Sequence, residues 1–152
     1  MKFSFSTKAK FKTKKTILFV CVQNAGRSQM AEGFFRKYAP EGFEPMSAGT
    51  MATSQINPLA IQVMNEIGID ISQQRSKELT EDMIRNSDMI INMGCMDKNF
   101  CPTLFIPKVI DWNIEDPKNM VIEKVREIRD EIERGIKELA ADVSVAEEEN
   151  NR

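Results

Sequence analysis

Histidine is absent from the 152 residues of this chain, and cysteine occurs only three times. Without an imidazole, the most common general base of enzymes, a nucleophilic side chain has to be activated in another way. A structural zinc site is also disfavoured, because such a site takes four ligands that are mostly Cys and His. In a reducing compartment a few cysteines are more often catalytic or metal-bound than disulfide-bonded, so each of the three is a candidate functional residue.

Long apolar runs are missing as well. The longest, about seven residues, falls short of the roughly 18 that a membrane span requires, and there is no signal-peptide core with a cleavage site. We therefore expect a cytoplasmic protein with no membrane partner. The net charge of -2, with 41% hydrophobic and 29% charged residues, argues against wholesale disorder and a generally basic surface. Nucleic acid is accordingly not an expected partner.

The two ends of the chain differ in composition from the segment between them. Residues 1–15 contain six lysines and no acidic residue. Blocks of like charge are usually solvated, so we expect a flexible basic extension there, with an interaction or targeting arm as the alternative. Residues 141–152 predict a flexible acidic tail by the same reasoning. A chain of this length suits one core, which leaves residues 16–140 as a single α/β domain.

Between the ends, strand patterns alternate with helix patterns. The continuous apolar run ILFVCV predicts a strand buried on both faces. Asn57 and Pro58 mark the N-cap and first residue of a helix that stops at Gly68, and Thr80 caps a shorter helix. Strands are expected at 17–22, 43–50, 88–94 and 107–112, and helices at 28–39, 57–68, 79–87 and 122–139. This alternation predicts a parallel sheet of four strands with helices on both faces.

The stretch CVQNAGRS, residues 21–28, joins the first predicted strand to the first predicted helix. A tight loop at a helix N-terminus directs backbone N–H groups inward and, with the helix dipole behind it, binds a tetrahedral oxyanion. Arg27 adds a planar, two-pronged donor for phosphate or arsenate oxygens. Cys21 would lie beneath the central atom of the anion, where the positive field favours the thiolate without a histidine.

The other loop residues fit the same interpretation. The Ser28 hydroxyl can hydrogen-bond the thiolate, Asn24 tolerates a left-handed conformation, and Gly26 allows either close approach of the backbone to the ligand or a positive φ. The oxyanion-binding loop thus comprises Val22, Gln23, Asn24, Ala25, Gly26 and Arg27. The alternative is that Cys21 is a small buried residue at a strand end and Arg27 a surface residue. A Walker-type nucleotide loop fits less well, because Gly-Lys before the hydroxyl residue is missing.

In a parallel sheet, ligands bind beyond the carboxyl ends of the strands. Cys21, Cys95 and Asp116 each follow a predicted strand closely, although they are far apart in sequence. One rim of the sheet could therefore hold all three side chains.

Four stretches, VCVQNAGRSQMAEGFF, SAGT, GIDIS and WNIEDP, together resemble the low-molecular-weight protein tyrosine phosphatase superfamily, whose fold is shared by a thioredoxin-coupled arsenate reductase branch. The resemblance covers about residues 16–139 and also implies a four-stranded parallel sheet. It implies that Cys21 is the nucleophile and Arg27 the oxyanion clamp, that Asn24 and Ser28 organise the loop, and that Asp116 is the general acid. Considered without the resemblance, Asp116 fits better as a turn residue before Pro117, and Asp111 is a further candidate acid.

Two cysteines in the second half of the chain help to decide between a tyrosine phosphatase and an arsenate reductase. Cys95 and Cys101 follow the third predicted strand, in MGCMDKNFCP. A second thiol can attack the sulfur of an arsenate adduct on Cys21 and expel arsenite, and a third can take over the disulfide and present it to a reductant. The resemblance implies that Cys95 is the resolving and Cys101 the final cysteine. The alternative is a pair of buried structural cysteines.

Three further positions compare with the family pattern. Tyrosine phosphatases usually carry aromatic residues just after the Asp-Pro, where this chain has Lys118 and Asn119, so an aryl substrate would lose its stacking partners. Many of the reductases have another cysteine where this chain has Gly26. Some also bind potassium through an acidic residue where this chain has Lys77, whose ammonium group either takes the same electrostatic role or lies at the surface.

These observations predict an arsenate reductase that converts arsenate to arsenite through Cys21, Asp116, Cys95 and Cys101, with a thioredoxin-like partner as reductant. No metal ion or organic cofactor is implied, and a monomer is expected. The first alternative is a low-molecular-weight phosphotyrosine protein phosphatase that hydrolyses phosphomonoesters. The second is a non-enzymatic module that binds oxyanions or senses thiol redox state through the same loop.

Overall fold

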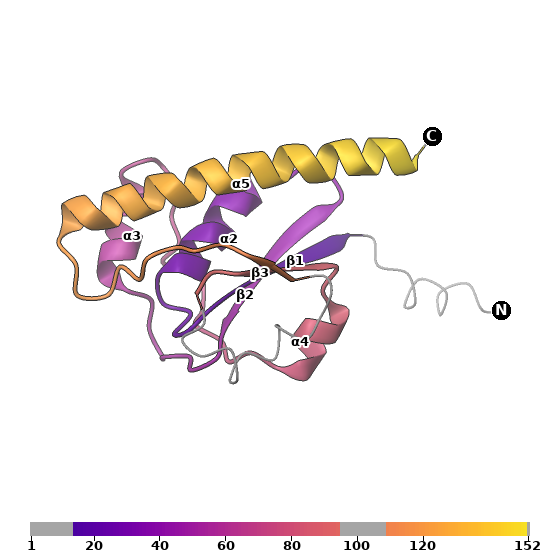
Figure 1. Cartoon of the computed structure of the whole chain (residues 1–152). Helices are drawn as coiled ribbons and strands as arrows, with labels where there is room; N and C mark the ends of the chain where they lie inside the picture. Colours follow the sequence, from indigo (N-terminus) through magenta and orange to yellow (C-terminus); the bar gives the residue numbers. More distant parts are fainter. Residues whose placement is uncertain (1–13, 95–108, 152) are drawn as a thin grey trace.

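The computed structural model describes residues 14–94 and 109–151 of the chain. In this part, four parallel strands form one sheet in the order β2-β1-β3-β4 (Figure 1). The strands are β1 (Lys15–Cys21), β2 (Phe43–Gly49), β3 (Met89–Asn92) and β4 (Val109–Asp111). The predicted parallel sheet is confirmed.

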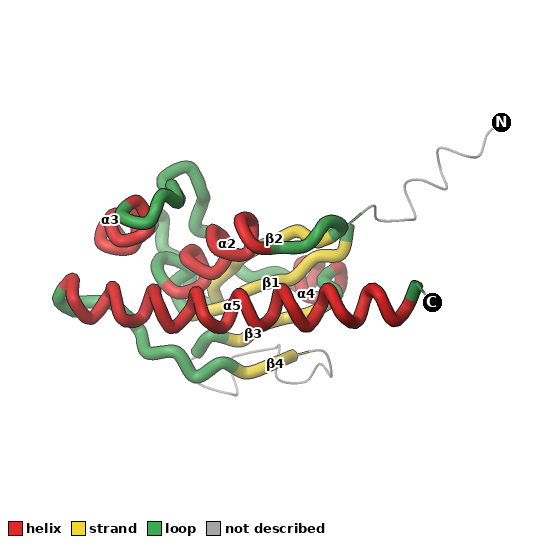
Figure 2. The backbone as a smooth tube through the Cα atoms, turned by 90° about the horizontal axis from the view of Figure 1, so that it is seen from above, coloured by secondary structure: helices red, strands yellow, loops and turns green. Residues whose placement is uncertain are grey.

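Helices cover both faces of this sheet, as predicted. Helices α2 (Arg27–Tyr38), α3 (Pro58–Asn65) and α5 (Ile122–Asn150) lie on one face, and α4 (Glu81–Asn86) lies on the other (Figures 1 and 2). Two helix starts follow the predicted capping chemistry: the side chains of Asn57 and Thr80 accept hydrogen bonds from the backbone N–H groups of Leu59 and Met83.

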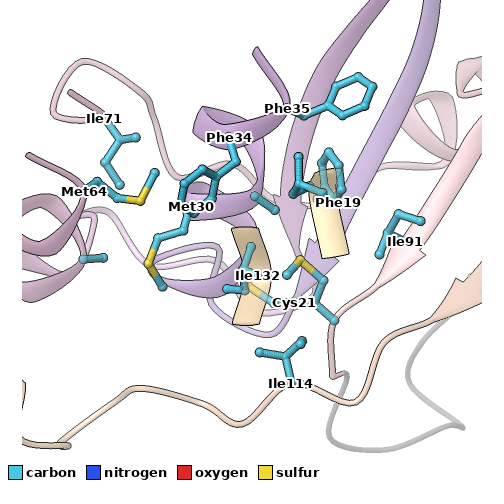
Figure 3. Packing of buried hydrophobic residues seen from close by; sticks show 14 of the residues in the cluster. Phe19, Cys21, Met30, Phe34, Phe35, Met64, Ile71, Ile91, Ile114 and Ile132 are labelled. Carbon is cyan, nitrogen blue, oxygen red and sulfur yellow. The ribbon is translucent and has the colours of Figure 1, made fainter. Parts of the chain in front are cut away.

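The two faces bury alternate residues of the same strand, because successive side chains of a strand point to opposite sides. Ile17, Phe19 and Cys21 of β1 belong to the larger cluster beneath α2, α3 and α5, in which Phe34, Phe35 and Ile132 also pack (Figure 3). Leu18 and Val20 face the smaller cluster with α4. The alternation directs the Cys21 side chain to the face on which α2 begins.

The prediction of a flexible acidic tail at residues 141–152 is wrong, because most of this segment is helical. Instead of ending near residue 140, α5 continues to Asn150 and extends beyond the sheet (Figure 1). The apolar spacing of the helix continues from Leu139 to Val143, which is buried, and Glu147 pairs with Lys15 at 2.9 Å. The acidic residues are therefore on a helix rather than in irregular chain. Residues 1–13 of the predicted basic extension lie outside the described residues. Lys15, the last residue of that extension, belongs to β1.

In the described ranges, residues 14–94 and 109–151, no helix combines the length and the apolarity that crossing a membrane would take.

Candidate active site

The loop after β1 is shaped by hydrogen bonds to its outer side. Backbone N–H groups of residues 50–57 donate, at 2.7 to 3.1 Å, to the carbonyls of Cys21, Val22, Gln23 and Ala25. The carbonyl of Asn24 accepts from Gln29 Nε2 at 3.0 Å. A β-carbon at Gly49 would collide with the backbone of the loop, so glycine is needed where β2 passes it. With its carbonyls bound outside, the loop has its N–H groups available for the concave side, as an anion-binding loop requires.

Cys21 is buried at the base of the loop. Its Sγ lies 2.8 Å from Ser28 Oγ in the first turn of α2. Ser28 Oγ also accepts a hydrogen bond from Asn24 Nδ2 at 2.7 Å, and Asn24 has the left-handed conformation expected of it, with φ of 52°. A thiolate at Cys21 would thus receive the Ser28 hydroxyl hydrogen.

Arg27 begins α2 and its side chain is buried. Its Nη1 donates to the carbonyls of Met93 and Ile114 at 3.0 and 3.1 Å, which fixes the guanidinium group at the carboxyl end of β3. Gly94, with φ of 114°, lies against this group, and a β-carbon there would overlap Arg27 Nη1. The guanidinium group is therefore held in one orientation before any anion binds.

Asp116 lies beside this guanidinium group although it is 95 residues away from Cys21 in the chain. Its Oδ2 is 3.6 Å from Arg27 Nη2, and its Oδ1 accepts from the backbone N–H of Lys118 at 3.0 Å. Pro117 packs on Gly26 so closely that a β-carbon on Gly26 would lie 3.0 Å from the Pro117 ring. The half-exposed Asp116 carboxylate is thus at the mouth of the loop, within reach of a bound anion.

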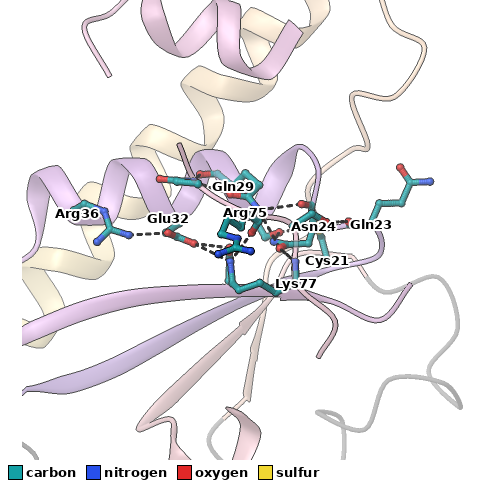
Figure 4. A network of polar contacts seen from close by, with 12 residues as sticks. Cys21, Gln23, Asn24, Gln29, Glu32, Arg36, Arg75 and Lys77 are labelled. Carbon is teal, nitrogen blue, oxygen red and sulfur yellow. Dashed lines mark hydrogen bonds and ion pairs between the residues drawn. The ribbon is translucent and has the colours of Figure 1, made fainter. Parts of the chain in front are cut away.

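Several groups behind the loop hydrogen-bond it, and these contacts were not predicted from the sequence. The backbone N–H of Lys77 donates to Asn24 Oδ1 at 2.8 Å, and Ser76 Oγ donates to the carbonyl of Gln23 at 3.1 Å. The buried Gln29 amide donates to Asn24 and to the carbonyl of Arg75 (Figure 4). The only signal in the sequence is the unusual density of Gln and Ser at 72–76, which does not reveal what these side chains contact.

A surface pocket of about 490 Å³ lies in front of the loop. Its lining includes Gln23, Gly26, Asn57, Asp116, Lys118 and Asn119, and no aromatic side chain is among the described residues that line it.

Other residues singled out in the sequence have different outcomes. Cys95 and Cys101 lie outside the described residues. Asp111 is on β4, where its Oδ1 accepts from Asn92 Nδ2 at 2.9 Å. Trp112 is partly buried against the core, with its ring centroid 6.3 Å from that of Phe19. Groups of three or more Cys, Asp or Glu suited to a metal ion do not occur in residues 14–94 and 109–151.

Comparison with known proteins places the chain in a family. Residues 16–150 match the model of low molecular weight phosphotyrosine protein phosphatases. An arsenate reductase of Staphylococcus aureus is 38% identical over 125 residues, which are 81% of this chain and 94% of that protein. The structure of a thioredoxin-dependent arsenate reductase from Corynebacterium glutamicum is 37% identical, with a TM-score of 0.75, over 91% of this chain and 67% of that one.

A third similar protein has a different activity. The YwlE arginine phosphatase from Geobacillus stearothermophilus is 28% identical and superposes with a TM-score of 0.79 over 89% of this chain and 96% of that one. The fold is thus shared by an arsenate reductase and an arginine phosphatase. The chain belongs to the low molecular weight phosphotyrosine protein phosphatase family.

Proposed function

We propose that this protein is an arsenate reductase that uses Cys21 as its nucleophile. The observation that carries the proposal is the hydrogen-bonded series Asn24, Ser28 and Cys21 at the base of an oxyanion loop, in a chain that also contains Cys95 and Cys101. The relatives that share 37 to 38% of the sequence and are arsenate reductases support it.

In the first step, the Cys21 thiolate attacks the arsenic atom and an S–As bond forms. The Arg27 guanidinium group and the loop N–H groups bind the arsenate oxygens, and their positive charge offsets the charge that develops on them. Asp116 donates a proton to the oxygen that departs, which leaves as water. The 3.6 Å separation of Asp116 from Arg27 supports this role, because it puts the carboxyl group beside the clamp of the same anion.

In the next step, a second thiol attacks the sulfur of Cys21. The S–As bond breaks, its electron pair goes to arsenic, and arsenite leaves while a disulfide forms. We assign this attack to Cys95, and we assign to Cys101 the exchange that frees Cys21 and leaves a Cys95–Cys101 disulfide. A thioredoxin-like dithiol then reduces that disulfide. Such a cycle belongs to a reducing compartment, in agreement with a cytoplasmic location, and needs only one chain.

The experiment follows arsenate-dependent oxidation of NADPH in the presence of thioredoxin and thioredoxin reductase. The wild type should turn over repeatedly. Cys95→Ser should abolish arsenite formation, whereas Cys101→Ser should allow about one arsenite per chain and then stop, because the Cys21–Cys95 disulfide is no longer transferred. Hydrolysis of an aryl phosphate by Cys95→Ser reports that the loop is intact.

A phosphomonoester hydrolase is the second candidate, and the family match and the arginine phosphatase of the same fold favour it. Attack of Cys21 on phosphorus uses the same residues, and water instead of a thiol resolves the adduct. Efficient hydrolysis that survives Cys95→Ser and Cys101→Ser, without arsenate-dependent NADPH oxidation, would establish this function and refute the reductase.

A further inference from the structure

The oxyanion loop and the segment that carries Asp116 meet through two adjacent pairs of residues. Arg27 Nη2 lies 3.6 Å from Asp116 Oδ2. The residue before Arg27 contacts the residue after Asp116, since a β-carbon built on Gly26 would lie 3.0 Å from Pro117 Cγ and 3.7 Å from Pro117 Cδ. The buried proline ring thus occupies the space that a side chain at position 26 would need.

The backbone conformation of residue 26 does not explain why it is a glycine. Gly26 has a φ of -130°, so a positive φ, one of the two roles expected of this glycine, is wrong. Its carbonyl accepts from the Met30 N–H at 2.9 Å in the first turn of α2, which fixes this residue relative to the helix. What the structure shows instead is that the absence of a side chain lets the loop approach Pro117 closely.

Pro117 is joined to Asp116 by more than the peptide bond. The Lys118 N–H donates to Asp116 Oδ1 at 3.0 Å, and the Met120 N–H donates to the carbonyl of Pro117 at 3.1 Å. The turn 116–120 is therefore held by hydrogen bonds on both sides of the proline ring. A displacement of Pro117 would carry the Asp116 carboxyl group with it.

The other end of the segment is fixed to the loop as well. The carbonyl of the buried Ile114 accepts from Arg27 Nη1 at 3.1 Å. The Asp116 side chain itself is 51% exposed, and among the described residues its polar contacts are the Arg27 guanidinium group and the Lys118 N–H. The position of the carboxyl group therefore depends on how the flanking residues Ile114 and Pro117 pack.

We infer that Gly26 is a positioning residue for the general acid. Because position 26 carries no side chain, Pro117 packs directly on the loop, and this contact sets the distance between the Asp116 carboxyl group and the bound anion. The inference rests on the proposed function, since it concerns the proton that Asp116 donates in the first step. Gly26 acts on that proton transfer through Pro117, so its role here is positioning and not catalytic.

The contact is close enough for one methyl group to disturb it. Carbon atoms that are not bonded to each other pack at roughly 3.5 to 4.0 Å. A β-carbon at 3.0 Å from Pro117 Cγ would therefore displace the ring by roughly half an ångström. Since displacement of a catalytic group by about 1 Å can cost about 10²-fold in rate, we expect Gly26→Ala to slow a reaction that needs the Asp116 proton by about 5- to 20-fold.

The experiment compares two aryl phosphates that differ in their need for a proton. Phenolate is a strong base, like the ionised tyrosine side chain, and departs readily only when an acid protonates it, whereas 4-nitrophenolate departs without a proton. In Gly26→Ala, kcat/KM for phenyl phosphate should fall by about 5- to 20-fold, and kcat/KM for 4-nitrophenyl phosphate should change by less than about 2-fold. Phosphate should protect Cys21 against alkylation by iodoacetamide as well as in the wild type, because the added methyl group would contact Pro117.

Three further variants show whether the effect passes through Pro117 and Asp116. In Asp116→Asn, which has no proton to donate, addition of Gly26→Ala should cause no further loss with phenyl phosphate. In Pro117→Ala, which lacks the ring, the added methyl group should likewise cost little, whereas an effect of the backbone at position 26 would persist. Gly68→Ala, which adds a methyl group in open surroundings, should leave the ratio of the two kcat/KM values unchanged.

Equal effects on both substrates would overturn the inference, and so would weaker protection by phosphate or a full loss from Gly26→Ala in the Asp116→Asn background. If Gly26→Ala does not fold, Pro117→Ala tests the contact from its other side. The same selective loss with phenyl phosphate is then expected, and its absence would overturn the inference.

The wild type separates this inference from the proposed function. Hydrolysis of both esters without reduction of arsenate would refute only the reductase. If the wild type reduces arsenate but hydrolyses neither ester, kcat/KM for arsenate replaces that for phenyl phosphate in the same comparisons, because the departing oxygen of arsenate also needs the proton. Absence of both reactions would refute the reductase and the positioning of its general acid together.

Discussion

Ser28 Oγ lies 2.8 Å from Cys21 Sγ and accepts a hydrogen bond from Asn24 Nδ2 at 2.7 Å. Because the Asn24 amide can only donate at that nitrogen, the Ser28 hydroxyl hydrogen is available to the sulfur. In the proposed reaction, the same hydrogen bond would stabilise the sulfur before it attacks and again when it leaves the adduct. In a chain without histidine, this hydroxyl would take over part of what an imidazole would otherwise do.

Replacement of Ser28 by alanine should therefore slow the reaction. We expect kcat for Ser28→Ala to fall by about 10- to 100-fold, the equivalent of a hydrogen bond to a charged group. Steady-state kinetics with arsenate and with an aryl phosphate measure the change. An unchanged kcat with both substrates would show that the hydroxyl does not assist the sulfur.

Asp116 can be tested against its neighbour in sequence. Asp116→Asn keeps the size of the side chain but removes the proton donor, so kcat should fall by about 10²- to 10⁴-fold, as for loss of general acid catalysis. Glu115→Gln is the matched control, because Glu115 is equally exposed and pairs with Lys124 at 3.2 Å. Equal losses in the two variants would assign the effect to surface charge instead of to acid catalysis.

Gly94 leaves room for the Arg27 guanidinium group, which a β-carbon at this position would overlap. Gly94→Ala and Gly68→Ala both put a side chain on a residue with positive φ, 114° and 82°, and each should lower the free energy of unfolding by about 1 kcal/mol. Only the first also displaces the Arg27 guanidinium group, because the surroundings of Gly68 are open. Phosphate binding, measured by protection of Cys21, should weaken about 10-fold or more in Gly94→Ala alone. Unchanged binding in Gly94→Ala would contradict the described packing.

The lowered pKa of Lys77 predicts the direction in which the free energy of unfolding changes with pH. Its pKa is lowered mainly by burial, an effect to which Arg36 and Arg75 add and which Glu32 opposes. The folded chain therefore releases this proton at a lower pH than the unfolded chain, whose lysine has its ordinary pKa of 10.5. Between the pKa of Lys77 in the folded chain and its pKa in the unfolded chain, the unfolded state binds more protons, so the free energy of unfolding rises with pH.

The measurement is urea unfolding from about pH 8 to the ordinary lysine pKa. The free energy of unfolding of the wild type, relative to Lys77→Gln, should increase over this range. Lys124 provides a control of opposite sign: its pKa is raised, first by the hydrogen bond to Glu115, so the wild type should lose stability relative to Lys124→Gln as the pH rises. The same trend in both comparisons would contradict the burial of Lys77.

The elements that sequence predicts well are those whose signals are local. The apolar run of β1, the caps at Asn57 and Thr80, and the order Cys-x5-Arg-Ser between a strand and a helix are each determined by a few adjacent residues. They were enough to predict the sheet and the anion loop. The end of α5 was missed because its acidic composition resembles a solvated tail, whereas the spacing of Leu139 and Val143 keeps one stripe of the helix buried.

The support behind the loop depends on contacts between distant segments. Gln29 and Arg75 are 46 positions apart, and Arg27 and Ile114 are 87 apart. No periodicity encodes such pairs, and a glutamine or lysine in an irregular segment reads as solvated surface. The sequence therefore predicts the groups that would meet the anion, but not Gln29 and Ser76, which hydrogen-bond the loop.

The central claim is that Cys21 is held as a thiolate in a loop that binds oxyanions, and its alkylation by iodoacetamide tests this most directly. At neutral pH, Cys21 should react faster than free cysteine, and arsenate or phosphate should slow the reaction in a saturable way. Peptide mapping identifies the labelled residue among the three cysteines. A rate no higher than that of free cysteine, unaffected by either anion, would contradict the account.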